Sequence, residues 1–363
     1  MFAVAIAATS AIALTQGRGE STQVGDSSAR PSDRFTVARG PGGDVSSTRG
    51  PDAAAGVTAS PSPDKSKAAG PVAGSPSAAA SPSAAAAGRV SGAASAAMLC
   101  GAAFQPESDG ESYQEALARE DRLLGKLDIV RVYYSGAPKP WPGKLDTSGR
   151  PMIVSFKMNP AQVASGGYDD QMRSWFANAP TDRDIYWVYY HEPEDNIEDG
   201  QFSAADYRAA WRRLASLADQ AGNARLHATL TLMGYSVEPA SGRNWRDYYP
   251  GKGVVDLIAW DIYNYVNEGK GGYRDPATLF SKAIEVTRGE GLPFAVAETG
   301  SAIASGDDGS GRAAWVRSTL RYLADRGAVF TSYFDMYVNA NHGPQHYELR
   351  DAAAQAAFRD VCG

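Results

Sequence analysis

The chain has 363 residues, of which 43% are hydrophobic and 21% are charged, and its formal net charge is -6. This mild acidity, without a basic stripe or a basic helix, argues against nucleic acid as a partner. The two cysteines and four histidines show no ligand spacing, so they do not make a zinc site. The length allows either two domains or one large barrel.

Residues 1–17, "MFAVAIAATSAIALTQG", form a short apolar run that ends in small residues and lacks the usual basic n-region. The run is too short for a comfortable membrane span, and it predicts a signal-like or anchor segment. We therefore expect a secreted or extracellular protein. The sequence leaves open whether this segment is cleaved or tethers the chain to a membrane or a cell wall.

Residues 18–97 are rich in Ala, Ser, Gly and Pro, with repeats such as "SPSP" and "GSPSAAASPS". A segment of this composition buries too little apolar surface to offset the entropy of ordering it, so it predicts a disordered linker. The remaining residues, 98–363, have the length of a single α/β barrel domain.

Short runs rich in β-branched and aromatic residues predict eight buried strands in this domain. The runs are residues 98–104, 127–134, 151–157, 184–190, 225–233, 255–263, 293–300 and 328–336. Amphipathic helical patterns separate most of them. The patterns are residues 112–127, 203–222, 276–291, 311–327 and 350–362.

The alternation of strands and helices predicts the fold class. Eight β/α repeats in this length indicate a (β/α)8 TIM barrel. Residues 234–253, after the fifth strand, read as a long loop with at most a short helix, so an open doubly wound sheet is the alternative. No Gly-rich nucleotide loop follows the first strand, which disfavours that alternative. Ser112 stands three residues before Glu115, as in a capping box at the start of the first helix.

The two cysteines, Cys100 and Cys362, lie near the two ends of the predicted domain. In an exported protein such a pair predicts a disulfide, with two unrelated buried thiols as the alternative. The bridge would close a loop over nearly the whole domain and contribute about 4–5 kcal/mol in the chain-entropy model.

Polar residues follow several of the predicted strands, where barrel enzymes have their active sites. Glu192 ends the fourth strand and Glu298 the seventh, so the two carboxyl groups could face each other across the barrel mouth. A pair of carboxyl groups flanking the scissile bond is what glycoside hydrolysis requires, and it needs no metal or organic cofactor. The alternative for Glu192 is a solvated acid at the end of a strand.

Other residues near these strand ends are candidates for binding substrate. His191, Asp261, Tyr263 and Asp335 are polar, and Asp261 either binds sugar hydroxyls or pairs with an arginine. Aromatic side chains offer flat faces that suit sugar rings, although a barrel core uses aromatics too. These aromatic candidates are Trp141, Trp187, Tyr190, Trp260, Tyr263, Tyr265 and Tyr333.

Three motifs in this order resemble clan A of the retaining glycoside hydrolases: "YYHEPED", "WDIYNY" and "AETG". The histidine before the glutamate resembles family 26, the endo-β-mannanase group. The resemblance implies that Glu192 is the acid/base and Glu298 the nucleophile. It also implies that His191 steadies substrate or nucleophile, and that Tyr263 is similar to the strand-six tyrosine that hydrogen-bonds the nucleophile.

Two positions depart from the family pattern. Val188, Tyr189 and Tyr190 stand where family 26 usually has an arginine, and Tyr333 or Phe334 replaces the clan's strand-eight tryptophan. We therefore expect a secreted retaining endo-β-glycosidase acting on a β-linked polysaccharide, for which a mannan is one candidate. A non-catalytic glycan- or cell-wall-binding barrel is the alternative. A third reading, a barrel enzyme of other chemistry, has only Lys157 as a Schiff-base candidate.

Overall fold

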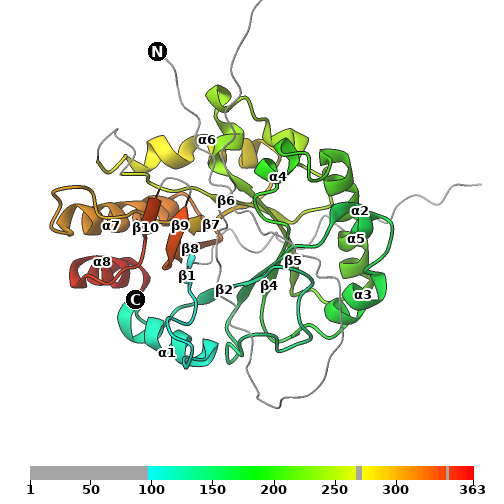
Figure 1. The fold of residues 1–363 in the computed structure, drawn as a ribbon, viewed down its shortest axis with the longest axis horizontal. Coiled ribbons are helices and arrows are strands. Elements are labelled where there is room, and N and C mark those ends of the chain that lie inside the picture. The colour runs from blue at the N-terminus through cyan, green and yellow to red at the C-terminus, as the bar shows by residue number, and fades with distance from the viewer. Residues whose placement is uncertain (1–96, 267–271, 341–342) are drawn as a thin grey trace, which may run out of the picture.

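The computed structural model describes residues 97–266, 272–340 and 343–363. The predicted signal-like segment and nearly all of the predicted linker lie outside these residues. Within them, eight parallel strands close into a barrel that is surrounded by helices (Figure 1). The first strand pairs with both the second and the eighth, which confirms the (β/α)8 barrel and excludes an open sheet.

Each barrel strand falls within the range predicted for it. The strands are β1 Leu99–Ala103, β2 Ile129–Tyr134, β3 Met152–Phe156, β4 Ile185–Tyr189, β5 Leu226–Met233, β6 Leu257–Asp261, β7 Phe294–Thr299 and β8 Phe330–Phe334. An antiparallel hairpin that the sequence did not indicate follows β8. Its strands are β9 Tyr337–Ala340 and β10 Gly343–His346.

The helices predicted from periodicity are all present. They are α1 Tyr113–Leu124, α5 Ala204–Gln220, α6 Pro276–Gly289, α7 Ser310–Asp325 and α8 Ala352–Cys362. The structure adds shorter helices and 3-10 turns. These are α2 Pro160–Ala164, α3 Asp169–Ala177, α4 Glu194–Glu198, η3 Gly234–Val237, η4 Pro239–Ser241 and η5 Trp245–Asp247. No helix among the described residues combines the length and apolar character that crossing a membrane requires.

The residues at the start of a helix explain why some helices could be predicted from the sequence and others could not. At α1 the Ser112 hydroxyl accepts from the Glu115 N–H at 3.2 Å, and the Glu115 carboxylate accepts from the Ser112 N–H at 2.8 Å, which confirms the capping box. By contrast, α3 follows Tyr168, which makes no side-chain cap hydrogen bond, so the start of this helix lacks a capping residue.

Successive strand residues point alternately into the barrel and towards the helices. The inner face is an apolar cluster of Ile129, Ile153, Tyr186, Val188, Leu257, Ala259, Ala295, Ala297 and Phe330. On β2 this alternation places Arg131 and Tyr133 on the same inner face as Ile129. A polar layer therefore lies above the apolar one, at the carboxyl ends of the strands.

A β-bulge in β7 changes this alternation at Glu298. The partner of Trp260 on β7 is Val296, whereas the partner of the next residue, Asp261, is Glu298, so β7 carries one extra residue at this step. Ala297 packs in the inner cluster, and strict alternation would turn the following residue outward. The bulge lets Glu298 face the inside of the barrel as well.

The predicted disulfide is present. Cys100 of β1 and Cys362 of α8 are bonded, with their Cα atoms 5.5 Å apart and a sequence separation of 262. α8 lies beside α1 and brings the C-terminus next to the beginning of the barrel (Figure 1). The bond therefore links the first strand to the last helix.

Replacing both cysteines, as Cys100→Ser/Cys362→Ser, is expected to lower the free energy of unfolding by about 4–5 kcal/mol, because the unfolded chain regains its loop entropy. Urea unfolding measures this difference. A reducing agent should bring the wild-type protein close to the variant and leave the variant unchanged. Equal stability of the oxidised protein and the variant would contradict the expectation.

Candidate active site

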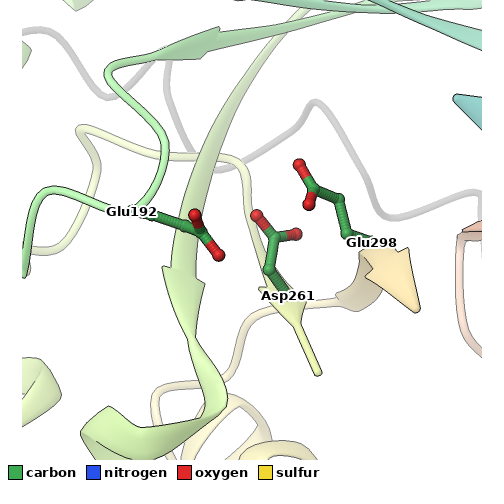
Figure 2. A group of neighbouring side chains, drawn as sticks. All are labelled: Glu192, Asp261 and Glu298. Carbon is green, nitrogen blue, oxygen red and sulfur yellow. The ribbon is translucent and has the colours of Figure 1, made fainter. Parts of the chain in front are cut away.

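Three carboxyl groups meet at the carboxyl ends of the barrel strands. Glu192 follows β4, Asp261 ends β6 and Glu298 lies in β7. One oxygen of each lies within 4.8 Å of an oxygen of each of the others. Figure 2 shows the carboxyl groups turned towards one another, with Asp261 between the two glutamates. The structure thus brings together the two glutamates that the sequence pairs.

Both carboxyl oxygens of Glu298 accept hydrogen bonds. The Tyr133 hydroxyl donates to Oε1 at 3.0 Å, and the Tyr263 hydroxyl donates to Oε2. The Arg131 guanidinium lies 3.1 Å from Oε1. Burial raises the pKa of both phenols, so both hydroxyls stay protonated and act as donors. Hydrogen bonds and a cation directed at a carboxylate stabilise its ionised form.

Asp261 pairs with the same arginine. Its Oδ1 lies 3.3 Å from Nη1 of Arg131, and Nη2 of that arginine donates to Ser155 at 3.3 Å. Burial raises the pKa of Asp261 well above its usual range, the Glu298 charge raises it further, and Arg131 opposes both effects. Of the two roles considered for Asp261, the structure provides the ion pair with an arginine.

Glu192 has a different environment. No hydrogen bond to its carboxyl group is present among the described residues, and burial raises its pKa well above the usual range. The charges of Glu298 and Asp261 raise the pKa further, whereas Lys157 lowers it. Glu192 is half-buried and lies among buried groups, so it is not a freely solvated strand-end acid.

The backbone at the end of β4 is strained. Tyr190 has a φ of 47° and Glu192 a φ of 50°, both in the left-handed region that glycine favours. The Tyr190 N–H donates to Phe156 O at 2.8 Å and the Glu192 N–H to Thr231 O at 3.2 Å, so both neighbouring strands hold this turn. Strain of this kind concentrates at functional sites, where it aims a side chain.

His191 lies between these two residues and beside Tyr133, with their ring centroids 5.4 Å apart in an edge-to-face contact. Burial lowers the pKa of His191 well below its usual range, and the nearby Lys157 and Arg131 lower it further, so the imidazole is neutral. Its buried Nδ1 has no hydrogen-bond partner within the described part of the chain. It is an enclosed polar atom whose hydrogen-bonding capacity the surrounding side chains leave unused.

Neither Arg131 nor Tyr133 was predicted to contact a catalytic carboxyl group, and Lys157 was considered only as a Schiff-base lysine. A charged residue in the middle of "IVRVYY", a run buried on both sides, was the available signal for Arg131. Tyr133 follows two positions later on the same face. Lys157 comes directly after β3, and its ammonium lies 5.0 Å from the centroid of the Tyr190 ring.

Two of the predicted aromatic residues, Tyr190 and Trp141, are only partly buried and pack against other rings. Tyr190 is half-buried and packs edge-to-face against Phe202, with ring centroids 4.7 Å apart. Trp141 stacks on Trp175 of α3 at 4.9 Å, and its indole N–H donates to the Trp175 carbonyl at 3.0 Å. Trp141 thus fastens the loop after β2 to α3, and these contacts do not involve the carboxyl groups.

Other predicted aromatics face away from the site. Trp187, Trp260 and Tyr333 are at most 1% exposed and belong to the core between the barrel and the helices. The Tyr333 hydroxyl donates to the Tyr347 carbonyl at 3.0 Å, which corrects the expectation that Tyr333 contacts substrate. The aromatic residue of β8 beside the site is Phe334, whose ring packs against Tyr263 at 5.8 Å.

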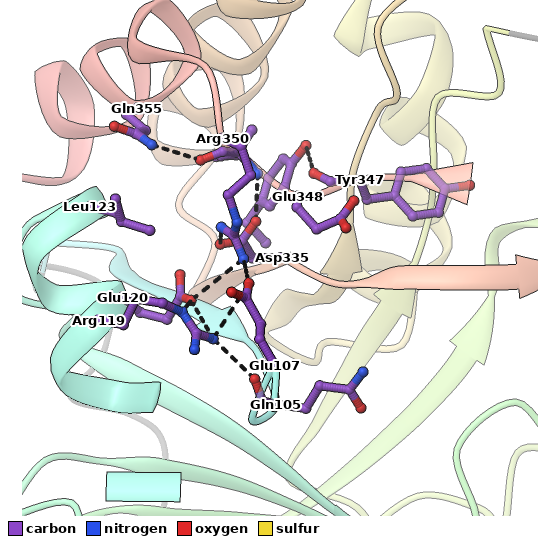
Figure 3. A network of polar contacts seen from close by, with 12 residues as sticks. Gln105, Glu107, Arg119, Glu120, Leu123, Asp335, Tyr347, Glu348, Arg350 and Gln355 are labelled. Carbon is purple, nitrogen blue, oxygen red and sulfur yellow. Dashed lines mark hydrogen bonds and ion pairs between the residues drawn. The ribbon is translucent and has the colours of Figure 1, made fainter. Parts of the chain in front are cut away.

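Asp335 also lies outside the site. Figure 3 shows it in a polar network with Glu120 of α1 and Arg350. Its Oδ1 accepts from the Leu349 N–H at 2.5 Å, and its Oδ2 lies 3.0 Å from Nη1 of Arg350. The predicted substrate contact is therefore corrected to a structural role. In this network, burial and then the neighbouring Asp335 raise the pKa of Glu120 to about 9.

The carboxyl oxygens of Glu192, Asp261 and Glu298 are atoms of the kind that coordinate a metal ion, and they lie close together. Both oxygens of Glu298 already accept hydrogen bonds from tyrosines. Two cations, Arg131 and Lys157, lie beside the carboxyl groups. A donor set engaged in this way, next to fixed positive charge, does not fit a bound cation.

Several solved structures are similar to the chain. An endo-β-1,4-mannanase of glycoside hydrolase family 26 from Cellulomonas fimi is 15% identical over 74% of this chain and 70% of that chain, with a TM-score of 0.49. A family 26 β-mannanase from Bacteroides ovatus is 13% identical over 73% and 88%, with a TM-score of 0.47. A mannanase from Bacillus subtilis is 14% identical over 73% and 85%, with a TM-score of 0.45. No family model and no curated protein matches the chain.

Arg131→Met is expected to lower the free energy of unfolding by about 3–5 kcal/mol near neutral pH, because two buried carboxylates lose their cation. The loss should shrink as the pH falls and these carboxyls become protonated. Urea unfolding at several pH values measures it. The double variant Arg131→Met/Asp261→Asn should be more stable than Arg131→Met alone, and the opposite order would contradict this account.

The Glu120 carboxyl is expected to make stability fall as the pH rises. Its folded pKa of about 9 lies above its unfolded value, so between these values the folded protein binds more protons than the unfolded chain. Glu120→Gln should remove this decline across pH 5 to 9, as measured by urea unfolding. Glu285→Gln, at an exposed position of α6, should keep the wild-type slope, and an equal slope in both variants would count against the assignment.

Proposed function

We propose that the protein is a secreted retaining endo-β-glycosidase that cuts a β-linked polysaccharide, with a mannan-like glycan as the first candidate. One observation carries the proposal: Glu192 and Glu298 face each other, with oxygens within 4.8 Å, in opposite environments. Retaining enzymes have carboxyl groups about 5–5.5 Å apart, whereas inverting enzymes need about 6.5–9.5 Å to admit a water. The short distance between the Glu192 and Glu298 oxygens supports a mechanism that retains the anomeric configuration.

Glu298 suits the nucleophile. Arg131, Tyr133 and Tyr263 contact its carboxyl oxygens and fix its orientation. In the first step a Glu298 oxygen bonds to the anomeric carbon while the bond from that carbon to the leaving oxygen breaks. The leaving oxygen takes the proton of Glu192, so the departing sugar leaves as a neutral alcohol.

Glu192 suits the acid/base because burial keeps its proton bound until the leaving oxygen needs it. After the first step Glu192 is ionised. It then accepts a proton from a water molecule, whose oxygen bonds to the anomeric carbon as the ester bond to Glu298 breaks. Both carboxyl groups return to their starting states, and two displacements give net retention.

The neighbouring residues supply binding rather than proton transfer. The neutral His191 packs edge-to-face against Tyr133 beside the acids, and the Tyr190 ring offers a half-buried face to a sugar ring. Asp261 holds Arg131 beside Glu298 through the ion pair between them. No resident metal or organic cofactor takes part in either displacement.

The motifs around both glutamates support a glycan substrate through their resemblance to family 26. The substrate stays a proposal, because Val188, Tyr189 and Tyr190 replace the family's arginine and Phe334 stands where the clan has tryptophan. Export of the protein, with tethering through residues 1–97, is part of the same proposal.

The alternative, a barrel that binds glycans without cleaving them, has less support. Carboxyl groups more than about 10 Å apart, or pointing apart, would have favoured it. The observed facing arrangement of Glu192 and Glu298 favours hydrolysis instead.

Glu298→Ala and Glu192→Ala are each expected to abolish the release of reducing ends from the true substrate. A panel of mannans, xylans and glucans first identifies that substrate, and a reducing-sugar assay then compares the variants. Glu120→Gln removes a buried carboxyl outside the site and should keep activity. Full activity in either alanine variant would overturn the assignment.

A further inference from the structure

Lys157 is a buried cation that the two displacements do not use. Its side chain is buried, and its ammonium lies over the Tyr190 ring. Its backbone N–H donates to Tyr134 O and Gly136 O, each at 3.2 Å, so the residue is fixed at the junction between β3 and the loop after β2. Burying a lysine is costly unless its charge has a partner.

The two cations of the site serve different carboxyl groups. Arg131 contacts Glu298 at 3.1 Å and Asp261 at 3.3 Å. Among the charges that act on Lys157, that of Glu192 is the strongest, followed by Glu298. Lys157 follows β3 directly beside the end of β4, and its ammonium lies 5.0 Å from the ring centroid of Tyr190, two residues before Glu192. This placement on the β4 side assigns Lys157 to the acid/base glutamate.

Charged groups from several strand ends act on Glu192 and Lys157. The negative groups that act on Glu192 are Glu298, Asp261 and, from α4, Glu194. The other cation near Lys157 is Arg131, while His191 is neutral. The nearby phenols of Tyr133, Tyr190 and Tyr263 stay protonated, since burial raises the pKa of each. Among the largest influences on Glu192, Lys157 is the positive charge that opposes the three acids.

We infer that Lys157 is a positioning residue that controls the proton of Glu192, helping it leave in the first displacement and keeping Glu192 ionised as the base in the second. This inference rests on the proposed glycosidase function. It assigns to Lys157 an electrostatic role and not the Schiff-base role that its strand-end position suggests.

The charge of Lys157 matters most after the first displacement. In the glycosyl-enzyme Glu298 is an ester and has lost its charge, so one of the repulsions that raise the pKa of Glu192 disappears. Lys157 continues to lower that pKa. Burial lowers the pKa of the ammonium itself, whereas both glutamates raise it, so the ammonium keeps its proton best while Glu192 is ionised.

The test is the pH dependence of kcat/KM, whose alkaline limb reports loss of the Glu192 proton in the free enzyme. In Lys157→Met the limb should move to higher pH by about one unit, because an opposite charge that favoured ionisation is gone. Lys157→Arg keeps a positive charge and should keep the limb near its wild-type position. Thermal unfolding of each variant checks that the barrel is intact, and Lys157→Gln replaces the methionine variant if that variant does not fold.

A second measurement uses an aryl glycoside of the sugar that the panel identifies, with a leaving group that needs no acid. The first displacement should then be nearly unaffected in Lys157→Met, while the second slows below the shifted pKa. A pre-steady-state burst of phenol that grows as the pH falls is expected in this variant and not in Lys157→Arg.

An unmoved alkaline limb in a folded Lys157→Met protein would overturn the inference, even if its activity were lower at every pH. The inference would also be overturned if the alkaline limb moved as far in Lys157→Arg as in Lys157→Met, because the loss of positive charge would then not be the cause. Failure of the broader proposal gives a different result: Glu192→Ala or Glu298→Ala would then remain active. Inactive alanine variants with an unmoved limb leave the glycosidase assignment standing and remove only the role of Lys157.

Discussion

The site depends on one buried arginine. Arg131 is fully buried, yet it lies within 3.3 Å of both Asp261 and Glu298. Desolvating a guanidinium is tolerable only when carboxylates and hydrogen-bond acceptors replace its water. The arginine therefore ties β2 to β6 and β7 at the height where the chemistry is proposed. This pairing and two tyrosine donors fix the orientation of the Glu298 carboxyl group.

Two local departures from regular geometry aim the glutamates. The extra residue in β7 turns Glu298 towards the inside of the barrel, directly after Ala297. Left-handed backbone at Tyr190 and Glu192 turns the chain at the end of β4. Both cost conformational energy that the hydrogen-bonded neighbouring strands offset. The regular barrel supplies the rigid frame, and the irregular positions supply the direction of each carboxyl group.

The sequence predicted the barrel and the glutamate pair because both rest on local patterns: apolar runs, helix periodicity and acids placed after strands. The sequence could not predict which side chains of each strand point into the barrel, because this depends on how the sheet closes. Tyr333 and Phe334 are neighbours, and only their register decides which one faces the site. Arg131 was missed for the same reason, because its partners come from strands far along the chain.

The disulfide also defines how the barrel would carry mechanical load. Residue 97 enters β1 at the amino ends of the strands, while the carboxyl groups lie at the opposite, carboxyl ends. Tension applied through the preceding chain reaches Cys100 before the rest of β1, and the covalent bond passes it to α8. A pull on residue 97 would therefore be carried by a helix on the outside of the barrel, at the end opposite the carboxyl groups.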